Sequence, residues 1–361
     1  MDGESRSTRP GSAGNDTFFL ARRAARELAD RPGVIGAFVV GGIAQGLHTP
    51  NSDIDIHLVG GDSPAPRTQF GIGRTRVDVH QVPLTRLAAL VDAVTAADVA
   101  DALAPTVPTA DLELLARVSQ ADVVVASDAL RALLDRLATS APAVRRQLLR
   151  HWLTTAHLWW EDHDGFLRIG EQDGALDAAR RSLVAAGKAV LVARGDLHPA
   201  PKWVWRQLDR SAPRGFPTEL FRALGRADLA SARDGVTTAD LEQLLQTCLL
   251  AAATVGWHGG ALADWTHWQR GSGALARAAG WHPRAAVTGV VAALAGRRRV
   301  ALRPDAALVW ALSGGVTDEE LAERIRAVGA ELPVYANLTA ARREVVVARL
   351  LASGLLVRDR G

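Results

Sequence analysis

The segment that most constrains the fold of this chain is a short run of alternating apolar and polar residues, 53–59. It reads Asp-Ile-Asp-Ile-His-Leu-Val, and side chains in a β-strand point alternately to opposite faces. Asp53, Asp55 and His57 therefore share one face, while the two isoleucines and Leu58 share the other. The pattern predicts a strand whose apolar face is buried and whose other face carries ionisable groups.

A second strand is predicted at Val34–Val40, and two glycines follow it directly. Gly41 and Gly42 allow a sharp turn that exposes backbone N–H groups before a short helical stretch. A polar loop, 48–52, then leads to Asp53. The turn and the carboxylates together suit a triphosphate with a bound metal, because the N–H groups face phosphate oxygens and the carboxylates hold the cation.

A third carboxylate lies in a predicted hairpin. Arg67–Ile72 and Thr75–Val82 both have strand patterns, and Arg76, Asp78 and His80 share one face of the second strand. We expect Asp78 to face the two aspartates of the first strand. Mg²⁺ prefers oxygen ligands and keeps several waters, so three aspartates predict a site for two Mg²⁺ ions.

These residues resemble the nucleotidyltransferase superfamily that includes DNA polymerase β and the aminoglycoside and lincosamide nucleotidyltransferases. The matching pattern is Gly41-Gly42, then Asp53-x-Asp55, then Asp78 on a neighbouring strand, and it covers roughly the first 140 residues. In that family the paired carboxylates bind the metals. The third carboxylate completes the site and is a candidate to take a proton from the acceptor hydroxyl.

One position departs from the family pattern. Many members carry Ser where this chain has Gly42, so the resemblance implies that one phosphate contact is absent or is supplied by Ser52. Taken singly, a Gly-Gly pair is usually a turn and an Asp-x-Asp is usually a solvated strand edge, so the combination carries the prediction. His57 and His80 share the polar face, where either a direct role or a position in the cleft wall is open.

Length and pattern predict an α+β chain of several domains. The chain has 361 residues, 48% of them hydrophobic, which is enough for two or three cores. The predicted parts are a disordered tail at 1–14, a mixed-sheet catalytic domain at 15–140, an all-helical domain at 141–296 and a small winged-helix-like domain at 297–361. No segment has the length and composition of a membrane span or a secretory leader, which predicts a cytoplasmic protein.

One lysine is singled out by composition. Lysine and arginine together number 42, yet only Lys188 and Lys202 are lysines, and an ammonium group suits phosphate as a compact charge. The segment around Lys202 resembles the helical domain of small-molecule nucleotidyltransferases, in which a lysine meets the triphosphate. The alternative is that Lys202 simply opens a helix after Pro201 while Trp203 fills the core.

The last 65 or so residues have the element order of a winged-helix domain, and Thr317 to Glu320 form a capping-box pattern. The segment is similar to small peptide-binding winged-helix chaperones of modified-peptide pathways, which implies a peptide or protein partner. A formal charge of +3 does not favour nucleic acid. We expect residues 297–361 to fold as a unit whose removal leaves nucleotide binding intact.

Residues 274–279, which belong to the preceding all-helical domain, are predicted to be helical.

The favoured function is Mg²⁺-dependent transfer of a nucleoside monophosphate, AMP from ATP first, to a hydroxyl group with release of pyrophosphate. An antibiotic-like small molecule is the first acceptor considered, and a peptide or protein is the second. The segment Glu161-Asp162-His163-Asp164, which stands beside two tryptophans, suits a cationic, sugar-like acceptor or a solvated helix end. A pair at Arg146 and His151 matches, by a loose spacing, helical ribonucleases. The alternative to catalysis is a nucleotide-binding pseudoenzyme or an antitoxin-like partner-binding protein.

Overall fold

The structure is a computed structural model that describes residues 12–61, 68–97, 107–227, 237–285, 291–295 and 298–358. The chain forms two compact units. The first comprises Met1–Ala96 and Val107–Val144, and the second comprises Ala97–Thr106 and Arg145–Gly361. Most of the expected tail, 1–14, lies outside the described residues, and helix α1 begins at Ser12, inside the stretch that was predicted to be disordered.

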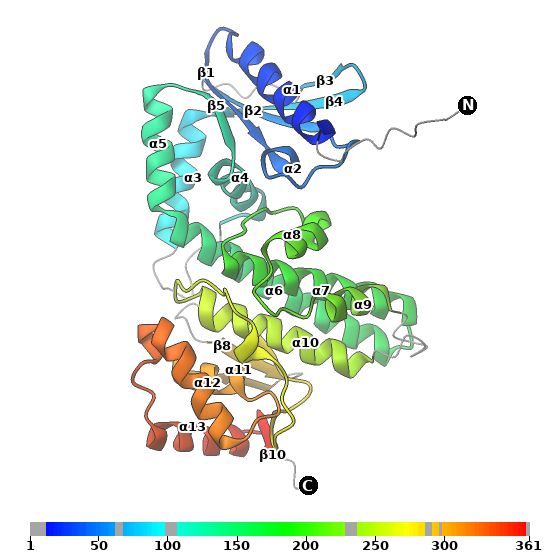
Figure 1. The fold of residues 1–361 in the computed structure, drawn as a ribbon, viewed down its shortest axis with the longest axis vertical. Helices are drawn as coiled ribbons and strands as arrows, with labels where there is room; N and C mark the ends of the chain where they lie inside the picture. The colour runs from blue at the N-terminus through cyan, green and yellow to red at the C-terminus, as the bar shows by residue number, and fades with distance from the viewer. Residues whose placement is uncertain are drawn as a thin grey trace, which may run out of the picture. The chain divides into compact units, whose positions relative to one another are not determined.

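The first unit contains a five-stranded sheet in the order β3-β4-β2-β1-β5 (Figure 1). Strands β2 and β4 are parallel, and the other neighbours are antiparallel. The sheet is therefore mixed, which confirms the predicted fold class of this region. The strands are β1 (Val34–Val40), β2 (Ile54–Gly60), β3 (Thr68–Ile72), β4 (Thr75–Pro83) and β5 (Asp122–Ala126).

The two faces of this sheet have different coverings. Helix α1 (Ser12–Ala29) packs its small apolar residues on the face that carries Ile54, Ile56 and Leu58. On the opposite face helix α5 (Asp128–Thr139) comes so close to Gly36 that an added Cβ would lie 2.1 Å from a methyl group of Leu130. The strand alternation thus directs the aspartates away from α1. Helices α2 (Gly41–Ala44), α3 (Leu84–Ala97) and α4 (Thr109–Ser119) complete the unit.

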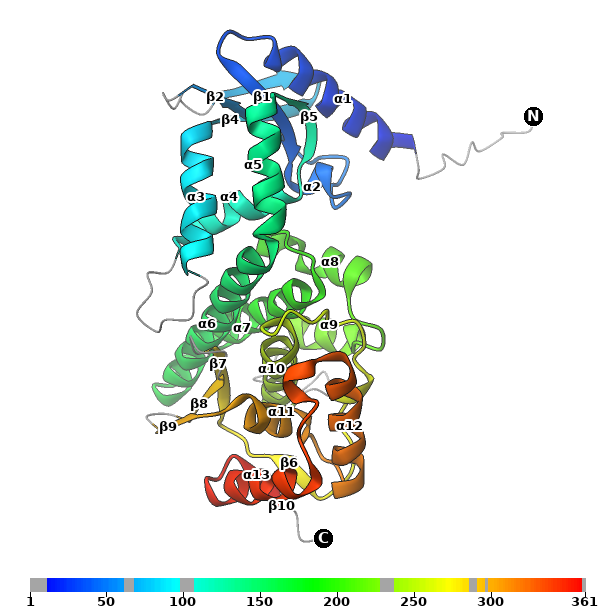
Figure 2. The ribbon, with the colours of Figure 1, turned by 90° about the vertical axis from the view of Figure 1, so that its left-hand side faces the viewer.

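The second unit is mainly helical in its first half, as predicted (Figure 2). None of the helices in the described part of the chain is both long and apolar enough to cross a membrane. The helices are α6 (Ala141–Arg168), which begins in the first unit, α7 (Gln172–Arg194), α8 (Val204–Ser211), α9 (Thr218–Arg226) and α10 (Thr238–Ala251). A short π-helical stretch, Ala252–Gly256, follows α10.

The C-terminal part of this unit combines short strands with three helices. Strands β7 (His282–Ala285), β8 (Val291–Ala295) and β9 (Arg298–Ala301) form an antiparallel sheet in that order. Helices α11 (Pro304–Leu312), α12 (Asp318–Glu331) and α13 (Ala340–Ala352) follow, and strand β10 (Leu356–Arg358) ends the described chain. The Thr317 capping box is present. The winged-helix assignment and the boundary at residue 296 stay predictions.

The helix expected at residues 274–279 was a wrong prediction. This stretch forms strand β6 (Leu275–Arg277), which pairs with β10. Leu275 also exchanges backbone hydrogen bonds with Val316, and an added Cβ at Gly273 would lie 2.1 Å from the Val316 carbonyl carbon. A short apolar run has no decisive periodicity, so contacts from distant parts of the sequence determined its structure.

Candidate active site

Asp55 and Asp78 stand directly opposite each other on adjacent strands. The parallel register of β2 and β4 pairs Asp55 with Asp78 and His57 with His80. Asp78 is fully buried and Asp55 is partly buried. The predicted convergence of these two carboxylates therefore rests on strand pairing, because matched residues of neighbouring strands point to the same face.

Asp53 lies just before β2 and joins the same cluster through Arg76. The Arg76 Nη2 atom donates to Asp53, and its Nε atom lies 3.3 Å from Asp78 Oδ1. The hydrogen bond to Asp53, followed by the charge of Asp78, raises the pKa of Arg76, and Asp55 adds a smaller effect. Asp53 and Asp78 thus contact one guanidinium group, and the charge of Asp55 acts on the same group. Arg76 was assigned no role from sequence, although its spacing of two from Asp78 places both on one face.

Gly41 makes room for Asp55. Its φ angle is +72°, and a Cβ atom built on it would lie 2.6 Å from Asp55 Oδ2. Any other residue at this position would combine an unfavourable backbone conformation with a steric clash. The turn after β1 is therefore shaped so that the Asp55 carboxylate approaches the backbone at Gly41. Gly42 accepts hydrogen bonds at its carbonyl from the N–H groups of Leu47 and His48.

Ser52 shapes the loop that precedes the first aspartate. Its hydroxyl accepts a hydrogen bond of 2.8 Å from the Thr49 N–H and lies 3.2 Å from the Thr49 hydroxyl. The predicted phosphate contact of Ser52 stays a prediction.

Two histidines, His57 and His80, lie side by side next to the carboxylates. The ring centroids of His57 and His80 lie 5.3 Å apart. Burial, with smaller effects from His80 and Arg117, lowers the pKa of His57 to about 3. His57 therefore carries no charge at neutral pH, and it neither repels a bound cation nor assists phosphate binding as a cation.

The donor atoms of the cluster suit a hard divalent cation. Carboxylate oxygens are the ligands that Mg²⁺ prefers, and Asp55 and Asp78 present them from paired strand positions beside the space left by Gly41. Among the residues that the structure describes, no three carboxylate, imidazole or thiolate groups gather around one point closely enough to hold an ion. Arg76 lies against Asp53 and Asp78, and its side chain is 60% exposed. A long exposed side chain has room to turn away, so the donor atoms present are of the kind that Mg²⁺ accepts, while the three carboxylates are not gathered around one point in this structure.

Lys202 lies in the second unit, on an exposed 3₁₀ turn, Pro201–Trp203. Its ammonium nitrogen is 5.3 Å from the centroid of the Trp203 ring, and Trp203 is partly buried. Lys202 itself is therefore not a core residue. Its predicted contact with the triphosphate stays a prediction.

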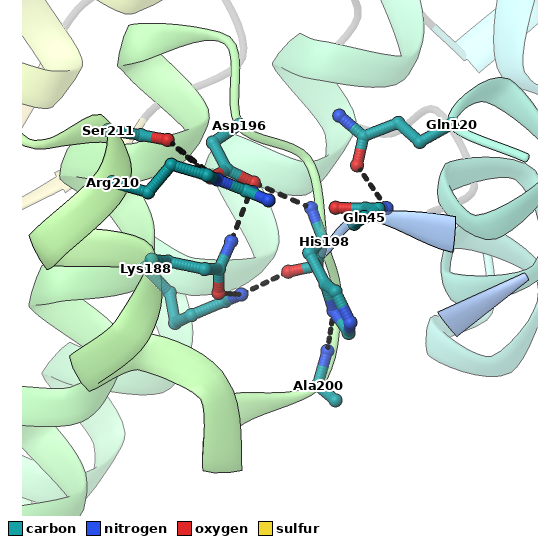
Figure 3. Close-up of polar contacts among 9 residues, drawn as sticks. Gln45, Gln120, Lys188, Asp196, His198, Ala200, Arg210 and Ser211 are labelled. Atoms are coloured by element: carbon teal, nitrogen blue, oxygen red, sulfur yellow. Dashed lines mark hydrogen bonds and ion pairs between the residues drawn. The ribbon is translucent and has the colours of Figure 1, made fainter. Parts of the chain in front are cut away.

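The other lysine anchors the chain that leads to Lys202 (Figure 3). Lys188 is fully buried, and its ammonium group donates to the His198 carbonyl and, at 2.6 Å, to Gln207 Oε1. Asp196 accepts from Gln207 at 2.7 Å and from Arg210 at 2.5 Å. The rarity of lysine drew attention to Lys188, but sequence gave no role for it.

A comparison with known protein families finds a match within the first unit. Residues 21–94 match the family described as Nucleotidyltransferase domain. This stretch is similar to nucleotidyltransferase domains. It contains every expected site residue except Lys202, and the match supports a transferase with nucleotidyl transfer as its general chemistry.

Other comparisons add little beyond the nucleotidyltransferase domain. A solved structure, a nucleotidyltransferase-like protein from Exiguobacterium sibiricum 255-15, is similar over 65% of this chain and 76% of that protein. The two share 16% of their residues, with a TM-score of 0.37. No curated protein matches the chain.

Proposed function

We propose that the chain transfers a nucleoside monophosphate, with ATP as the favoured donor, to a hydroxyl group of a second substrate and releases pyrophosphate. The observation that carries the proposal is the pairing of Asp55 with Asp78 on β2 and β4 beside Gly41, with Asp53 joined to Asp78 through Arg76. This cluster lies within the matched nucleotidyltransferase domain. A protein that had abandoned catalysis for partner binding has no need of three converging carboxylates and a glycine fitted to one of them.

In this proposal each site residue has at least one of three roles: metal binding, phosphate binding or proton transfer. Asp53, Asp55 and Asp78 would hold two Mg²⁺ ions, and these would supply positive charge for the α-phosphate and the departing pyrophosphate. Gly41, Gly42 and Ser52 orient the phosphates, and Lys202 neutralises the leaving group. The acceptor oxygen attacks the α-phosphorus, the bond from this phosphorus to the bridging oxygen of the β-phosphate breaks, and Asp78 takes the hydroxyl proton.

A specific observation favours a peptide as the acceptor or partner. Strand β9 is an edge strand of its sheet among the described residues. A cavity of about 300 Å³ lies between β9 and α13, and its wall includes Val300, Val346 and Leu350. An exposed strand edge beside an apolar cavity suits an extended peptide, because the backbone pairs with the edge while a side chain enters the cavity. An antibiotic-like small molecule remains the other acceptor class of this proposal.

The deciding experiment is a transfer assay with mass detection. The protein is incubated with Mg²⁺, each of the four NTPs in turn, and a panel of aminoglycoside-type, lincosamide-type and peptide acceptors. An acceptor whose mass rises by one nucleoside monophosphate, together with pyrophosphate release, supports the proposal and identifies the acceptor class. Tight NTP binding without pyrophosphate release from any acceptor favours the pseudoenzyme alternative.

A further inference from the structure

A polar cavity in the second unit has no role in the proposed transfer. Its volume is about 360 Å³, which is large enough for a small metabolite. The wall combines the first turns of α10, the glycine-rich segment 270–274, strand β6 and the pair Gly314-Gly315. All of these elements belong to the second unit.

Arg277 is the most unusual residue of the wall. Its guanidinium group donates at 2.6 Å to the Ala311 carbonyl and at 2.5 Å to the Thr247 hydroxyl, which are both uncharged. The Nε atom is buried and has no hydrogen-bond partner among the described residues. Gly314 lies so close that an added Cβ would be 3.4 Å from both terminal nitrogens of Arg277. Arg277 as a whole is half-buried, and a cation that is partly removed from water and satisfied only by neutral acceptors is costly, because no anion replaces the hydration it loses.

Two further arginines add to this positive charge. Burial, and then the charges of Arg324 and Arg270, lower the pKa of Arg277 to about 10. Arg270 donates at 2.7 Å to Gln243 Oε1, and Arg324 donates to backbone carbonyls of the 267–269 turn. Within the described ranges, none of the three forms an ion pair with a carboxylate. Arg270 and Arg277 belong to the cavity wall and Arg324 lies outside it, so a bound anion stabilises the two wall arginines against the mutual repulsion of these charges.

Two carboxylates, those of Asp240 and Glu242, belong to the wall itself, and each has partners of its own. Asp240 Oδ2 accepts from the backbone N–H and the hydroxyl of Thr237, in the capping box of α10. Glu242 Oε1 accepts from the Gly280 N–H and lies 3.6 Å from His282 Nε2. Glu320, four residues before Arg324, accepts from the Thr317 N–H and only partly offsets the effect of burial on the pKa of Arg324. These hydrogen bonds hold the wall carboxylates to other partners, so among the described residues neither acid forms an ion pair with Arg270 or Arg277.

We propose that this cavity binds a small molecule through an oxyanion, a phosphate or a carboxylate, which the guanidinium groups of Arg277 and Arg270 hold. A planar guanidinium group suits both kinds of anion because it donates two parallel hydrogen bonds. The polar remainder of the wall, which includes Gln243 and Ser272, accommodates a hydrophilic molecule. This site is independent of the proposed transfer, since none of its residues belongs to the nucleotidyltransferase domain.

The test uses the full chain in EDTA, so that no metal supports phosphate binding at the aspartate cluster. Inorganic phosphate, pyrophosphate and succinate are titrated separately by calorimetry at fixed ionic strength. Saturable binding of at least one anion is expected, and the anion that binds distinguishes a phosphate ligand from a carboxylate ligand. Arg270→Gln is the deciding variant, because Arg270 makes only one side-chain hydrogen bond in the described structure and its loss leaves Arg277 in place.

The matched control is Arg326→Gln, which removes the same charge from an exposed position on α12, two residues from Arg324 and outside the cavity wall. We expect at least tenfold weaker anion binding in Arg270→Gln and unchanged binding in Arg326→Gln. Arg277→Lys keeps the charge but loses the paired donors, and a folded variant is expected to bind phosphate at least tenfold more weakly. Absence of saturable binding in the wild type, or equal losses in Arg270→Gln and Arg326→Gln, overturns the proposal.

Discussion

At the scale of single residues, Arg76 is the most informative feature that the structure adds to the aspartate pattern. Its guanidinium group lies against Asp53 and Asp78, and so links a loop residue to a residue of β4. Without a cation the three carboxylates would repel one another, so Arg76 compensates their charge. The same position makes Arg76 a competitor of any metal that these carboxylates bind.

The first prediction follows from this competition. Arg76→Gln is expected to bind Mn²⁺, used as a probe for Mg²⁺, several-fold more tightly than the wild type in calorimetric titrations, because a positive charge no longer opposes the ion. Arg74→Gln, at the exposed turn between β3 and β4, is the matched control and should change affinity little. Weaker metal binding in Arg76→Gln would mean that Arg76 organises the ligands instead of competing with the metal.

The second prediction concerns the carboxylates themselves. Asp53→Asn and Asp55→Asn should each reduce transfer by at least 100-fold while the melting temperature changes by no more than a few degrees. Each loses a charged metal ligand but keeps a similar shape. Asp92→Asn, which removes an exposed carboxylate on α3, should retain full activity. Pyrophosphate release and thermal melts are the measurements, and near-normal turnover in either site variant contradicts the assignment.

The third prediction uses the neutral histidine. The pKa of His57 is about 3 in the folded chain and about 6.5 in an unfolded one, so the unfolded state binds more protons between these values. Stability should therefore fall as pH decreases through this window, by at most about 1.4 kcal/mol per pH unit from this residue. His57→Gln should flatten that dependence in urea denaturation from pH 7 to 4. Parallel pH profiles for the variant and the wild type would exclude His57 as the cause.

At the scale of elements, prediction from sequence succeeded where the pattern was local and periodic. The alternation of residues 53–59 placed Asp55 on the correct face, and the Gly-Gly turn correctly preceded the site. The contact of Arg76 with Asp53 was not predicted. It depends on the pairing of β2 with β4, and no local sequence pattern indicates which strands pair. Strand β6 was wrongly predicted for the same reason, since its partners Val316 and β10 lie far along the chain. The role of Lys188 could not be predicted, because it depends on the position of the His198 carbonyl in the folded chain.

The connection between α7 and α8 yields the fourth prediction, because it contains an anchor and an exposed lysine. Asp196 is 7% exposed, and despite its burial the hydrogen bonds from Arg210, Ser211 and Gln207 lower its pKa. Asp196→Ala should therefore cost about 3 kcal/mol of unfolding free energy, since it leaves several buried donors without an acceptor. Lys202→Ala should leave melting unchanged and raise the KM for NTP. Urea denaturation and steady-state kinetics measure the two effects.

The sign of the pH dependence supplies a control for Asp196. Its depressed pKa means that its stabilising effect is present above the unfolded value of about 3.9 and is lost as pH falls further. The stability difference between the wild type and Asp196→Ala should therefore shrink below pH 4.

A Lys202→Ala variant that melts at a lower temperature than the wild type but has normal kinetics would assign Lys202 a structural role.

At the scale of the whole molecule, contacts cross the expected boundary at residue 296. Strand β6 pairs with β10, and the Tyr335 hydroxyl donates at 2.8 Å to the Thr254 carbonyl. Trp310 of α11 is fully buried. The part after residue 297 therefore shares its core with the part before it. The expectation of a separable C-terminal domain stays a prediction, and these contacts lead us to expect a different result from a truncation.

The fifth prediction is that a chain ending at residue 296 loses the cooperative unfolding of its second unit but keeps that of the first. The cut removes the partner of β6, leaves the Thr254 carbonyl without the Tyr335 hydroxyl and exposes Leu275, which is 2% exposed in the intact chain. The sheet of the first unit keeps all its partners, because its strands lie between residues 34 and 126. Hydrogen exchange followed by mass spectrometry reports the two units separately. The result expected is rapid exchange in α10 and β6 with protection retained in β1, β2 and β4. Full protection of α10 after truncation would establish the C-terminal part as an independent domain, and loss of protection in β2 would show that the nucleotidyltransferase domain depends on it.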